Sequence, residues 1–385
     1  MSICYLDYNA TTPIAPEVRE GMLPYLGERY GNPSSLHAAG KESLSAINKA
    51  RESVAKLLVC DVREVVFTSG ATESNNHAIR AALKLHPKRK RIVTTSVEHS
   101  SVRSILKYLS ESEGSELTIL QVDSNGNLDL KQLESALNDE VALVSVMWAN
   151  NETGVVFPID AISKIAQKKN ILLHVDAVQA IGKLGIDLSK TKIDFLSLST
   201  HKFYGPKGAG ILYANRKIEL PPFIIGGSQE RGRRGGTENL LGIVGTGKAA
   251  QMISEGWRNH AATIELLRNR LEAELLKQIP HSFVNGAASE RICNTSNIAF
   301  PGTVSEIILP LLDERGICAS SGAACLTGAV EPSHVLLAMG LSREQALSSV
   351  RFSLGWGTTQ KEIDYAIEVI PEIIKRIRQS ECSIP

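Results

Sequence analysis

Residues 197–210 read SLSTHKFYGPKGAG, and the lysine in this stretch is the point from which the chain is best understood. An apolar stretch of strand length, residues 193–198, leads into small hydroxyl residues, then the pair His201-Lys202, and then a glycine-rich turn. A lysine in this position can form an imine with an aldehyde, and the hydroxyl and imidazole groups beside it can hold a phosphate. The stretch therefore predicts a site for a phosphorylated aldehyde cofactor at Lys202.

Strands and helices alternate on the N-terminal side of this stretch. Short apolar or β-branched segments predict strands at 65–68, 91–95, 141–148, 171–175 and 193–198. Helical spacing of apolar residues predicts helices at 42–58, 72–85, 102–112 and 159–169. This alternation predicts an α/β fold built on a largely parallel sheet with both faces covered.

The pattern changes after Gly236. A long helical stretch over 238–278 is predicted to be two helices that meet near Gly256. It is followed by a mixture of predicted strands and helices, at 296–300, 304–315, 350–353 and 361–378. This mixture predicts a second, smaller α+β domain. We expect a large domain over 15–257 and a small domain formed by 1–14 and 258–385.

Composition excludes several classes of protein. The 42 basic and 41 acidic residues nearly cancel, which predicts no binding surface for nucleic acid or an anionic membrane. The longest apolar stretch, 141–149, is too short to span a bilayer, and the N-terminus does not resemble a signal peptide. The six cysteines form no CxxC pair, so neither a zinc site nor a disulfide framework is indicated. A reduced, cytoplasmic protein is expected.

Polar residues follow four of the predicted strands, at the carboxyl ends where open α/β sheets bind ligands. They are Thr72, His99, Asn150 and Asp176. A carboxylate such as Asp176 can keep a pyridine nitrogen protonated, and Gln179 can donate to a ring oxygen. Each residue alone has an ordinary alternative, as a helix cap or a structural histidine. Four such residues at one edge of a sheet favour a ligand site.

Three later segments contain residues that could bind a ligand or take part in a reaction. Cys325 lies in ASSGAACLTG (319–328), whose small residues suit an exposed, mobile nucleophile, although a free surface thiol is the alternative. Arg351, on a predicted strand, can bind a carboxylate with two hydrogen bonds or form a surface ion pair. The segment GGSQERGRRGGTE (226–238) suits an ordered loop at a phosphate or a subunit interface, or a solvated basic loop.

Taken in order, these motifs resemble those of the cysteine desulfurases of the nitrogen-fixation and iron–sulfur-cluster type. The matching segments cover nearly the whole chain: YLDYNATTP (5–13), GNPSSLH (31–37), GATESN (70–75), EH (98–99), NNETG (150–154), VDAVQ (175–179), STHKFYGPKGAG (199–210), RGRRGGT (231–237), SSGAAC (320–325), EPSH (331–334) and VRFS (350–353). The long segment around Cys325 resembles the loop of one group within this family, in which the loop that carries the cysteine is long and mobile.

The resemblance implies the type I fold of pyridoxal-phosphate-dependent transferases, with a mainly parallel seven-stranded sheet in the large domain. It implies a homodimer with active sites at the subunit interface, L-cysteine as substrate and pyridoxal phosphate as cofactor. Sulfur would pass to Cys325 as a persulfide and then to an iron–sulfur scaffold or another acceptor protein. Whether Cys325 transiently binds an iron–sulfur cluster as a metal ligand stays open.

The resemblance also implies a role for each site residue. Lys202 would bind the cofactor covalently, and His99 would stack on its ring and act as an acid or base. Asp176 would pair with the ring nitrogen and Gln179 with the ring oxygen. The phosphate would be held by Ala71, Thr72, Ser199 and His201, with Thr237 from the partner subunit. Asn150 and Arg351 would bind the substrate carboxylate, and Asn150 would also contact the cofactor.

Two other classes of function remain open from the sequence. Another pyridoxal-phosphate enzyme of the same fold, such as an aminotransferase or a selenocysteine lyase, would share Lys202 and Asp176. A non-catalytic scaffold would use Cys325 only to bind a partner or a metal. A persulfide trapped on Cys325 would distinguish a cysteine desulfurase from the first alternative. The visible absorption of bound cofactor would distinguish it from the second.

Overall fold

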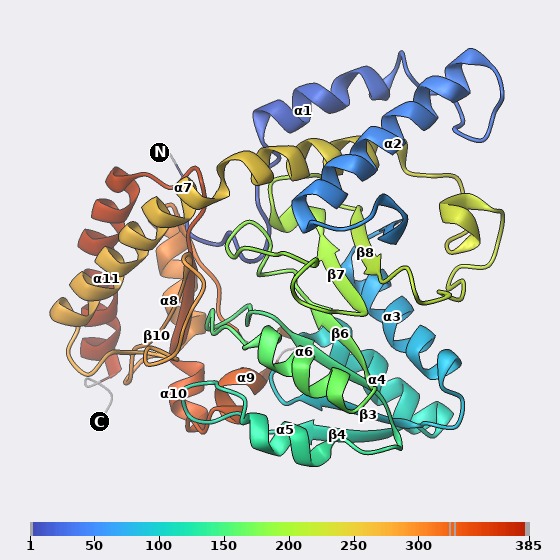
Figure 1. Ribbon diagram of the computed structural model, residues 1–385. Coiled ribbons are helices and arrows are strands. Elements are labelled where there is room, and N and C mark those ends of the chain that lie inside the picture. The colour runs from blue at the N-terminus through green and yellow to red at the C-terminus, as the bar shows by residue number, and fades with distance from the viewer. Residues whose placement is uncertain (1–2, 323–324, 327–328, 382–385) are drawn as a thin grey trace.

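The computed structural model describes residues 3–322, 325–326 and 329–381, and its centre is a seven-stranded sheet (Figure 1). Within this sheet only β8 runs antiparallel to its neighbours, β2 and β7, so the prediction of a mainly parallel seven-stranded sheet is confirmed. The strands in spatial order are β2 (Val65–Thr68), β8 (Gly210–Ala214), β7 (Phe195–Ser199), β6 (Leu172–Asp176), β5 (Val141–Met147), β3 (Arg91–Thr95) and β4 (Glu116–Leu120).

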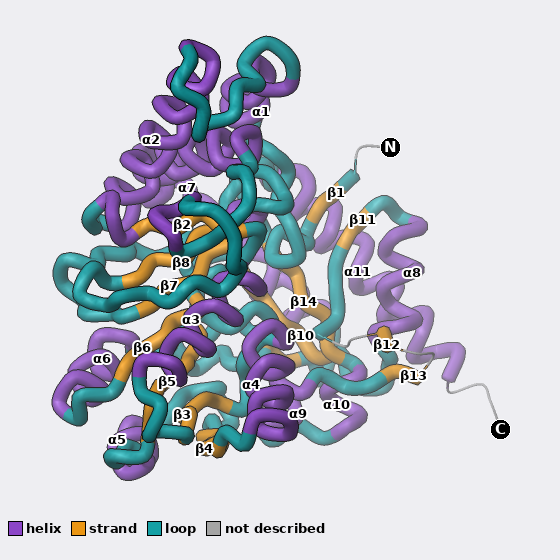
Figure 2. The backbone as a smooth tube through the Cα atoms, turned by 90° about the vertical axis from the view of Figure 1, so that its right-hand side faces the viewer, coloured by secondary structure: helices purple, strands orange, loops and turns teal. Residues whose placement is uncertain are grey.

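Helices cover both faces of this sheet. Because successive side chains of a strand point to opposite faces, Val65 and Phe67 of β2 join one hydrophobic cluster and Val66 joins another. The second cluster includes residues of α3 (Ala71–Leu85) and α4 (Ser100–Glu113), which lie together over one face (Figure 2). The first includes residues of α1 (Pro16–Met22), α2 (Ala38–Leu58), α5 (Leu130–Ala136) and α6 (Ile159–Lys168).

The strand register brings three carboxyl ends side by side. Met147 of β5 pairs with Asp176 of β6, and Asp176 pairs with Ser197 of β7. The loops that follow these strands therefore start at one edge of the sheet. This edge is where open α/β sheets bind ligands.

The predicted break near Gly256 is wrong, because α7 (Leu240–Gln278) is one helix of 39 residues. Its first half contributes Ile253 to the cluster beneath the large sheet, and its second half contributes Ile264 to a separate cluster. A glycine inside a helix costs only about 1 kcal/mol relative to alanine, which packing on both sides of Gly256 offsets. The predicted domain boundary at 257/258 falls between these two sets of contacts.

The separate cluster belongs to a smaller group of elements beside the large sheet (Figure 1). It holds a three-stranded antiparallel sheet in the order β14-β10-β9, and β1 pairs in parallel with β11. The strands are β1 (Cys4–Tyr5), β9 (Phe283–Val284), β10 (Thr295–Ala299), β11 (Ile317–Cys318) and β14 (Ser349–Ser353), with helices α8 (Ser305–Glu314) and α11 (Gln360–Glu381). The short helices α9 (His334–Ala338) and α10 (Arg343–Leu347) contribute Val335, Leu336 and Ala346 to the first cluster instead.

The remaining elements are short. A two-stranded antiparallel pair joins β12 (Cys325–Leu326) to β13 (Ala329–Val330). The 3-10 helices are η1 (Leu23–Leu26), η2 (Val62–Glu64), η3 (Thr200–Lys202) and η4 (Gln229–Gly232). Over the described part of the chain, every helix is too short or too polar to cross a membrane.

Candidate active site

A cavity of about 680 Å³ opens at the carboxyl ends of β5, β6 and β7. The structure brings nine of the predicted site residues to its wall: Ala71, Thr72, His99, Asp176, Gln179, Ser199, His201, Lys202 and Arg351. Two others, Asn150 and Thr237, do not line it. The side chain of Cys325 lies outside the described part of the structure. That this residue is exposed and can ligate a metal therefore stays a prediction.

Lys202 ends η3, directly after β7, and its amine is held by main-chain carbonyl groups. The Nζ donates to the carbonyl oxygens of Asn9 at 2.6 Å and Ala10 at 2.7 Å. Burial, aided by the positive charge of Arg351, lowers the pKa of Lys202 to about 8. A larger fraction of this amine is therefore neutral and nucleophilic near neutral pH than for an ordinary lysine.

Asp176 is the last residue of β6, and its carboxylate is oriented by two donors. Asn75 Nδ2 donates to Oδ2 at 2.9 Å, and the backbone N–H of Val178 donates to Oδ1 at 3.1 Å. The sequence interpretation missed Asn75, although Asn75 follows Thr72 by three residues and so lies on the same face of α3. The pair fixes a carboxylate where it can meet a cationic ring nitrogen.

His99 caps the N-terminus of α4. Its Nδ1 accepts from the backbone N–H of Ser101 at 3.2 Å and lies 2.8 Å from the Ser101 hydroxyl. Because an N–H can only donate, Nδ1 is the acceptor nitrogen, and the neutral ring carries its proton on Nε2. Burial lowers the pKa of His99, Asp176 raises it and Lys202 lowers it, so the ring is held toward its neutral form.

An anion-binding corner is formed where α3 begins. Gly70 precedes the helix, and no side chain caps it, so the first N–H groups of α3 stay available beside Ala71 and Thr72. Gly210 packs against the backbone here, since a Cβ on Gly210 would lie 2.5 Å from the Cα of Gly70. Glycine at position 210 thus lets β8 approach the start of α3.

Two side chains from the lysine segment complete this corner. Ser199 ends β7, and His201 lies beside Thr11, with 3.1 Å between Nδ1 and the Thr11 hydroxyl. Burial, with the charges of Lys202 and Lys207, lowers the pKa of His201 to about 4. A neutral His201 and the Ser199 hydroxyl can both donate a hydrogen bond to a phosphate.

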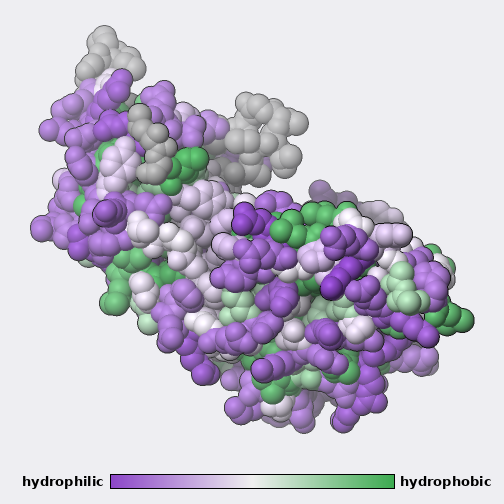
Figure 3. All heavy atoms as spheres, turned by 90° about the horizontal axis from the view of Figure 1, so that it is seen from above, coloured by the Kyte–Doolittle hydropathy of each residue, from purple (hydrophilic) through white to green (hydrophobic). Residues whose placement is uncertain are grey.

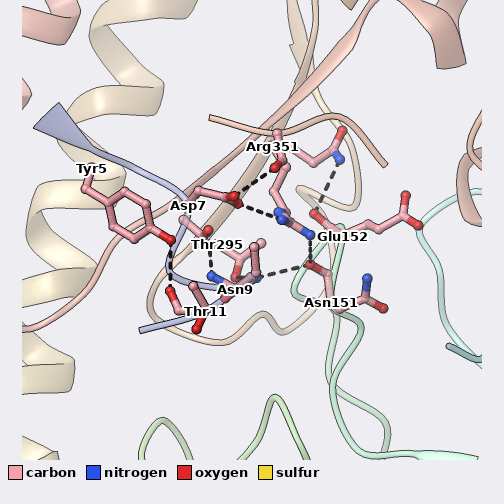
Figure 4. A network of polar contacts seen from close by, with 12 residues as sticks. Tyr5, Asp7, Asn9, Thr11, Asn151, Glu152, Thr295 and Arg351 are labelled. Atoms are coloured by element: carbon pink, nitrogen blue, oxygen red, sulfur yellow. Dashed lines mark hydrogen bonds and ion pairs between the residues drawn. The ribbon is translucent and has the colours of Figure 1, made fainter. Parts of the chain in front are cut away.

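Arg351 lies on β14 and reaches the cavity from the smaller group of elements (Figure 4). Its Nη2 forms an ion pair with Asp7 Oδ1 at 2.7 Å, and its Nη1 donates to the carbonyl oxygen of Asn151 at 3.1 Å. Its Nε has no hydrogen-bond partner among the described residues. Asp7 also accepts from the Ser320 hydroxyl at 2.9 Å, so one carboxylate holds both groups.

Asn150 is turned away from this cavity. The side chain is 2% exposed, and its Nδ2 donates to the carbonyl oxygen of Val97 at 3.2 Å. Its Oδ1 accepts from the backbone N–H groups of Glu152 and Thr153 at 2.9 and 3.0 Å. The amide therefore stabilises the turn after β5, and neither end of it is free for a ligand.

The glycine- and arginine-rich segment 226–238 is anchored beside the corner at α3. Glu230 is buried and forms two hydrogen bonds with Arg51, at 2.8 and 2.6 Å. Arg234 forms an ion pair with Glu73 in the first turn of α3, at 3.0 Å. This segment is ordered, as one of the sequence interpretations predicted, while Thr237 itself is exposed and outside the cavity.

Known proteins are similar to this chain along nearly its whole length. The sequence profile described as "Aminotransferase class-V" matches residues 4–366. A cysteine desulfurase of Nostoc sp. is 50% identical over 98% of this chain and 94% of its own length, and the cysteine desulfurase NifS of Azotobacter vinelandii is 48% identical over the same shares.

Solved structures agree with the sequence relatives. A NifS-like protein superimposes with a TM-score of 0.92 at 38% identity, over 98% of this chain and all of the other. The structure titled "SspA in complex with cysteine" superimposes with a TM-score of 0.80 at 37% identity, over 91% of this chain and 98% of the other. The predicted type I fold is thereby confirmed. The chain belongs to the class-V aminotransferase family, whose members use pyridoxal phosphate, and the two sequence relatives named above are cysteine desulfurases.

Proposed function

We propose that the cavity lined by Lys202, Asp176 and His99 is where this chain, a cysteine desulfurase, removes the sulfur of L-cysteine. The convergence of these three residues with Arg351 on one cavity carries the assignment. In the overall reaction the C–S bond of L-cysteine breaks and an S–S bond to Cys325 forms. The substrate carbon gains a proton, so the products are L-alanine and a persulfide on Cys325.

The residues of the cavity fit pyridoxal phosphate. Lys202 would bind its aldehyde carbon, Asp176 would pair with its ring nitrogen, and Gln179 would donate to its ring oxygen. The uncapped start of α3 at Ala71 and Thr72, with Ser199 and His201, would hold its phosphate. When bound, the cofactor supplies an electron sink for the electron pair left by the substrate's α-proton.

Lys202 and His99 carry the protons in this proposal. The lowered pKa of Lys202 suits an amine that accepts the α-proton at Nζ and returns a proton later. The neutral His99 ring offers its Nε2–H as a hydrogen-bond donor within the cavity, and transfer of this proton requires that Nδ1 take up another. Burial lowers the pKa of both groups. They differ in role because only His99 has a nitrogen, Nδ1, that the backbone N–H of Ser101 fixes as an acceptor.

Arg351 binds the substrate carboxylate in this proposal. Its Nε–H is unpartnered among the described groups, and the cavity wall includes this residue. A buried donor without a partner is costly, so a carboxylate that accepts from it is stabilised. Asp7 would keep the guanidinium at the edge of the cavity while the substrate is absent.

The experiment that tests the function uses the cofactor-loaded protein with L-cysteine. We expect one alanine for each sulfur released, and a persulfide on Cys325 detectable by mass spectrometry. The variant Cys325→Ala should keep the cofactor's visible absorption and lose sulfide production by at least a hundredfold. Full sulfide production by this variant would remove Cys325 from the reaction, and amino transfer to a keto acid without sulfide would favour an aminotransferase.

We infer that the active chain is a homodimer. Large hydrophobic side chains are exposed around α1, η1 and the segment before α2: Leu23 53%, Leu26 66%, Tyr30 80% and Leu36 88%. Figure 3 views the molecule from above, the side on which α1 and α2 lie, and shows hydrophobic patches among hydrophilic ones. Exposed apolar side chains gathered in this way are typical of a protein–protein interface. A partner subunit would supply Thr237, which lies outside the cavity of its own chain.

The persulfide on Cys325 would pass to an acceptor protein, with an iron–sulfur scaffold as the expected class. We place the reaction in the cytoplasm. Cys4, Cys60, Cys293 and Cys318 are free thiols, as is usual in a reducing compartment. Such a compartment would also keep Cys325, which accepts the sulfur, in its thiol form. We also propose the division into a large domain over 15–257 and a small domain over 1–14 and 258–385. The clusters on either side of Gly256 support it.

A further inference from the structure

Lys183 is a lysine beneath the cavity that the reaction as described does not use. It lies four residues after Gln179, in the segment that follows β6. Its Nζ donates to Gln179 Oε1 at 2.6 Å and lies 3.4 Å from Asn9 Oδ1. Both partners are buried, with 4% and 1% of their surfaces exposed. The amine therefore lies against buried amide groups, although part of the side chain reaches the surface.

Two contacts decide which way the Gln179 amide faces. Burial lowers the pKa of Lys183 to about 7, and the amine keeps at least two N–H donors in either protonation state. The other end of the amide meets the Asn9 carbonyl, which can only accept, so the group that faces Lys183 is the oxygen. With Oε1 at Lys183, Nε2 lies on the other side, where it donates to the carbonyl oxygen of Asn9 at 3.0 Å. Gln179 lines the cavity, and its second N–H is the donor that the amide can offer there.

Asn9 is itself held in place, which makes the arrangement rigid. Its side chain donates to the Thr295 hydroxyl at 2.8 Å and to the carbonyl oxygen of Asn151 at 3.1 Å (Figure 4). Its Oδ1 accepts from Asn294 at 3.0 Å as well as facing Lys183. The Asn9 carbonyl that receives Gln179 also receives the amine of Lys202.

We propose that Lys183 is a positioning residue that holds the Gln179 amide with its N–H toward the cavity, so that the site offers a hydrogen-bond donor to the anionic ring oxygen of the cofactor. The inference rests on the proposed function, because that function places the ring oxygen at Gln179. Lys183 acts through Gln179 and touches neither the cofactor nor the substrate. Without Lys183, the amide oxygen loses its donor, and the Asn9 carbonyl is left to orient the amide from its other end.

A double-mutant cycle tests this inference with Lys183→Met, Gln179→Ala and the combined variant. Methionine keeps the length of the side chain and removes its donors. The readouts are the dissociation constant of pyridoxal phosphate and the visible spectrum of the bound cofactor at fixed pH, both measured without cysteine. We expect Lys183→Met to weaken cofactor binding about tenfold, as for one hydrogen bond to a charged group, and to change the spectrum as Gln179→Ala does.

The combined variant separates positioning from a general structural effect. If Lys183 acts through Gln179, adding Lys183→Met to Gln179→Ala changes neither readout further. A full tenfold effect of Lys183→Met in the Gln179→Ala background would overturn the inference, as would an unchanged spectrum in the single variant. Lys183→Leu removes the donors in a second way if the methionine variant does not fold, with the same expectations.

Two controls keep this test apart from the proposed function. Lys190→Met removes a lysine on the same segment that is 82% exposed and pairs with Asp187, and it should leave both readouts unchanged. Failure of the unaltered protein to bind pyridoxal phosphate would overturn the proposed function and this inference together. If the unaltered protein binds the cofactor normally and Lys183→Met changes neither readout, only the inference is overturned.

Discussion

At the scale of single residues, burial places a proton on an acid directly beside the site. Glu98 is fully buried, and its Oε1 accepts from the Thr95 hydroxyl at 2.6 Å and from the backbone N–H of Met147 at 3.1 Å. Its Oε2 has no hydrogen-bond partner in the described structure. Burial, with the charge of Asp176, raises the pKa of Glu98 to about 8. A neutral Glu98 avoids a second negative charge near the carboxylate of Asp176.

This raised pKa has a definite effect on stability. Between the ordinary carboxyl pKa near 4 and a pKa of about 8, the folded chain keeps a proton on Glu98 that the unfolded chain releases. The stabilisation from this group is complete below the ordinary pKa and is lost as pH rises through 8. We expect Glu98→Gln to gain thermal stability relative to the unaltered chain as pH increases from 6 to 9, measured as the difference in Tm.

The difference between the two proteins is the useful quantity, because buried amines such as Lys202 titrate in the same range with the opposite sign. Glu111→Gln serves as a matched control, since this glutamate on α4 is 65% exposed. Its Tm difference should stay nearly constant with pH. A constant difference for Glu98→Gln as well would mean that Glu98 is already ionised in the folded chain.

The types of residue at the site could be predicted from the sequence, but the supporting contacts could not. Lys202, Asp176 and His99 follow strand ends, and a strand end fixes on which edge of the sheet a residue lies. The groups that orient them are the carbonyl oxygens of Asn9 and Ala10 and the side chain of Asn75. Main-chain carbonyls are the same for every residue type, so nothing in the sequence distinguishes those two. Asn150 was placed at the correct strand end, but the turn after β5 takes up its amide.

At the scale of elements, five strands of the seven-stranded sheet were predicted, and β4 and β8 were not. β5 is buried along its whole length and is identified by its composition. β4, at the edge of the sheet, buries only its last residue, Leu120, and β8 follows a glycine-rich turn that hides its start. The hydrophobic signal of β4 is weak because most of its residues meet water, whereas β2, at the other edge, is buried throughout and was predicted.

The unbroken helix α7 leads to a prediction at Gly256. A Cβ at this position would meet only the His260 ring, at 3.6 Å, which is an ordinary contact. Alanine also has a higher helix propensity than glycine, so Gly256→Ala should stabilise the folded chain by about 0.5–1 kcal/mol. Thermal or urea unfolding measures the change.

Another glycine of the same helix provides the matched control. A Cβ on Gly247 would lie 2.4 Å from the Cα of Ala50 on α2, where backbone leaves no room. We expect Gly247→Ala to destabilise the chain, with the opposite sign to Gly256→Ala. Loss of stability at Gly256→Ala would indicate that the helix needs a flexible point there, as the sequence pattern first suggested.

At the scale of the whole molecule, the exposed apolar side chains near α1 predict how the chain associates. Leu26 and Leu36 are 66% and 88% exposed, and the free energy of burying such side chains is about 1.5–3 kcal/mol each. Replacing both with glutamate should convert the proposed dimer to a monomer, which light scattering after size-exclusion chromatography measures as a halved mass.

Leu266→Glu is the control for this experiment, because Leu266 is 72% exposed on the second half of α7, away from α1. This variant should remain dimeric. A dimer that survives the double substitution at Leu26 and Leu36 would place the interface elsewhere. A monomer in the unaltered chain would leave the apolar side chains near α1 without the proposed partner.

The N-terminal segment joins the two ends of the chain, and this has a consequence for biosynthesis. β1 pairs with β11, and the carbonyl of Leu6 accepts from the backbone N–H of Ser353 at 2.7 Å. The same segment then supplies the carbonyl groups that hold Lys202. Leu6 leaves the ribosome long before Ser353 and thus waits for it before reaching its final place. A chain that has not been translated as far as Ser353 has no finished pocket, so cofactor capture follows the synthesis of β14.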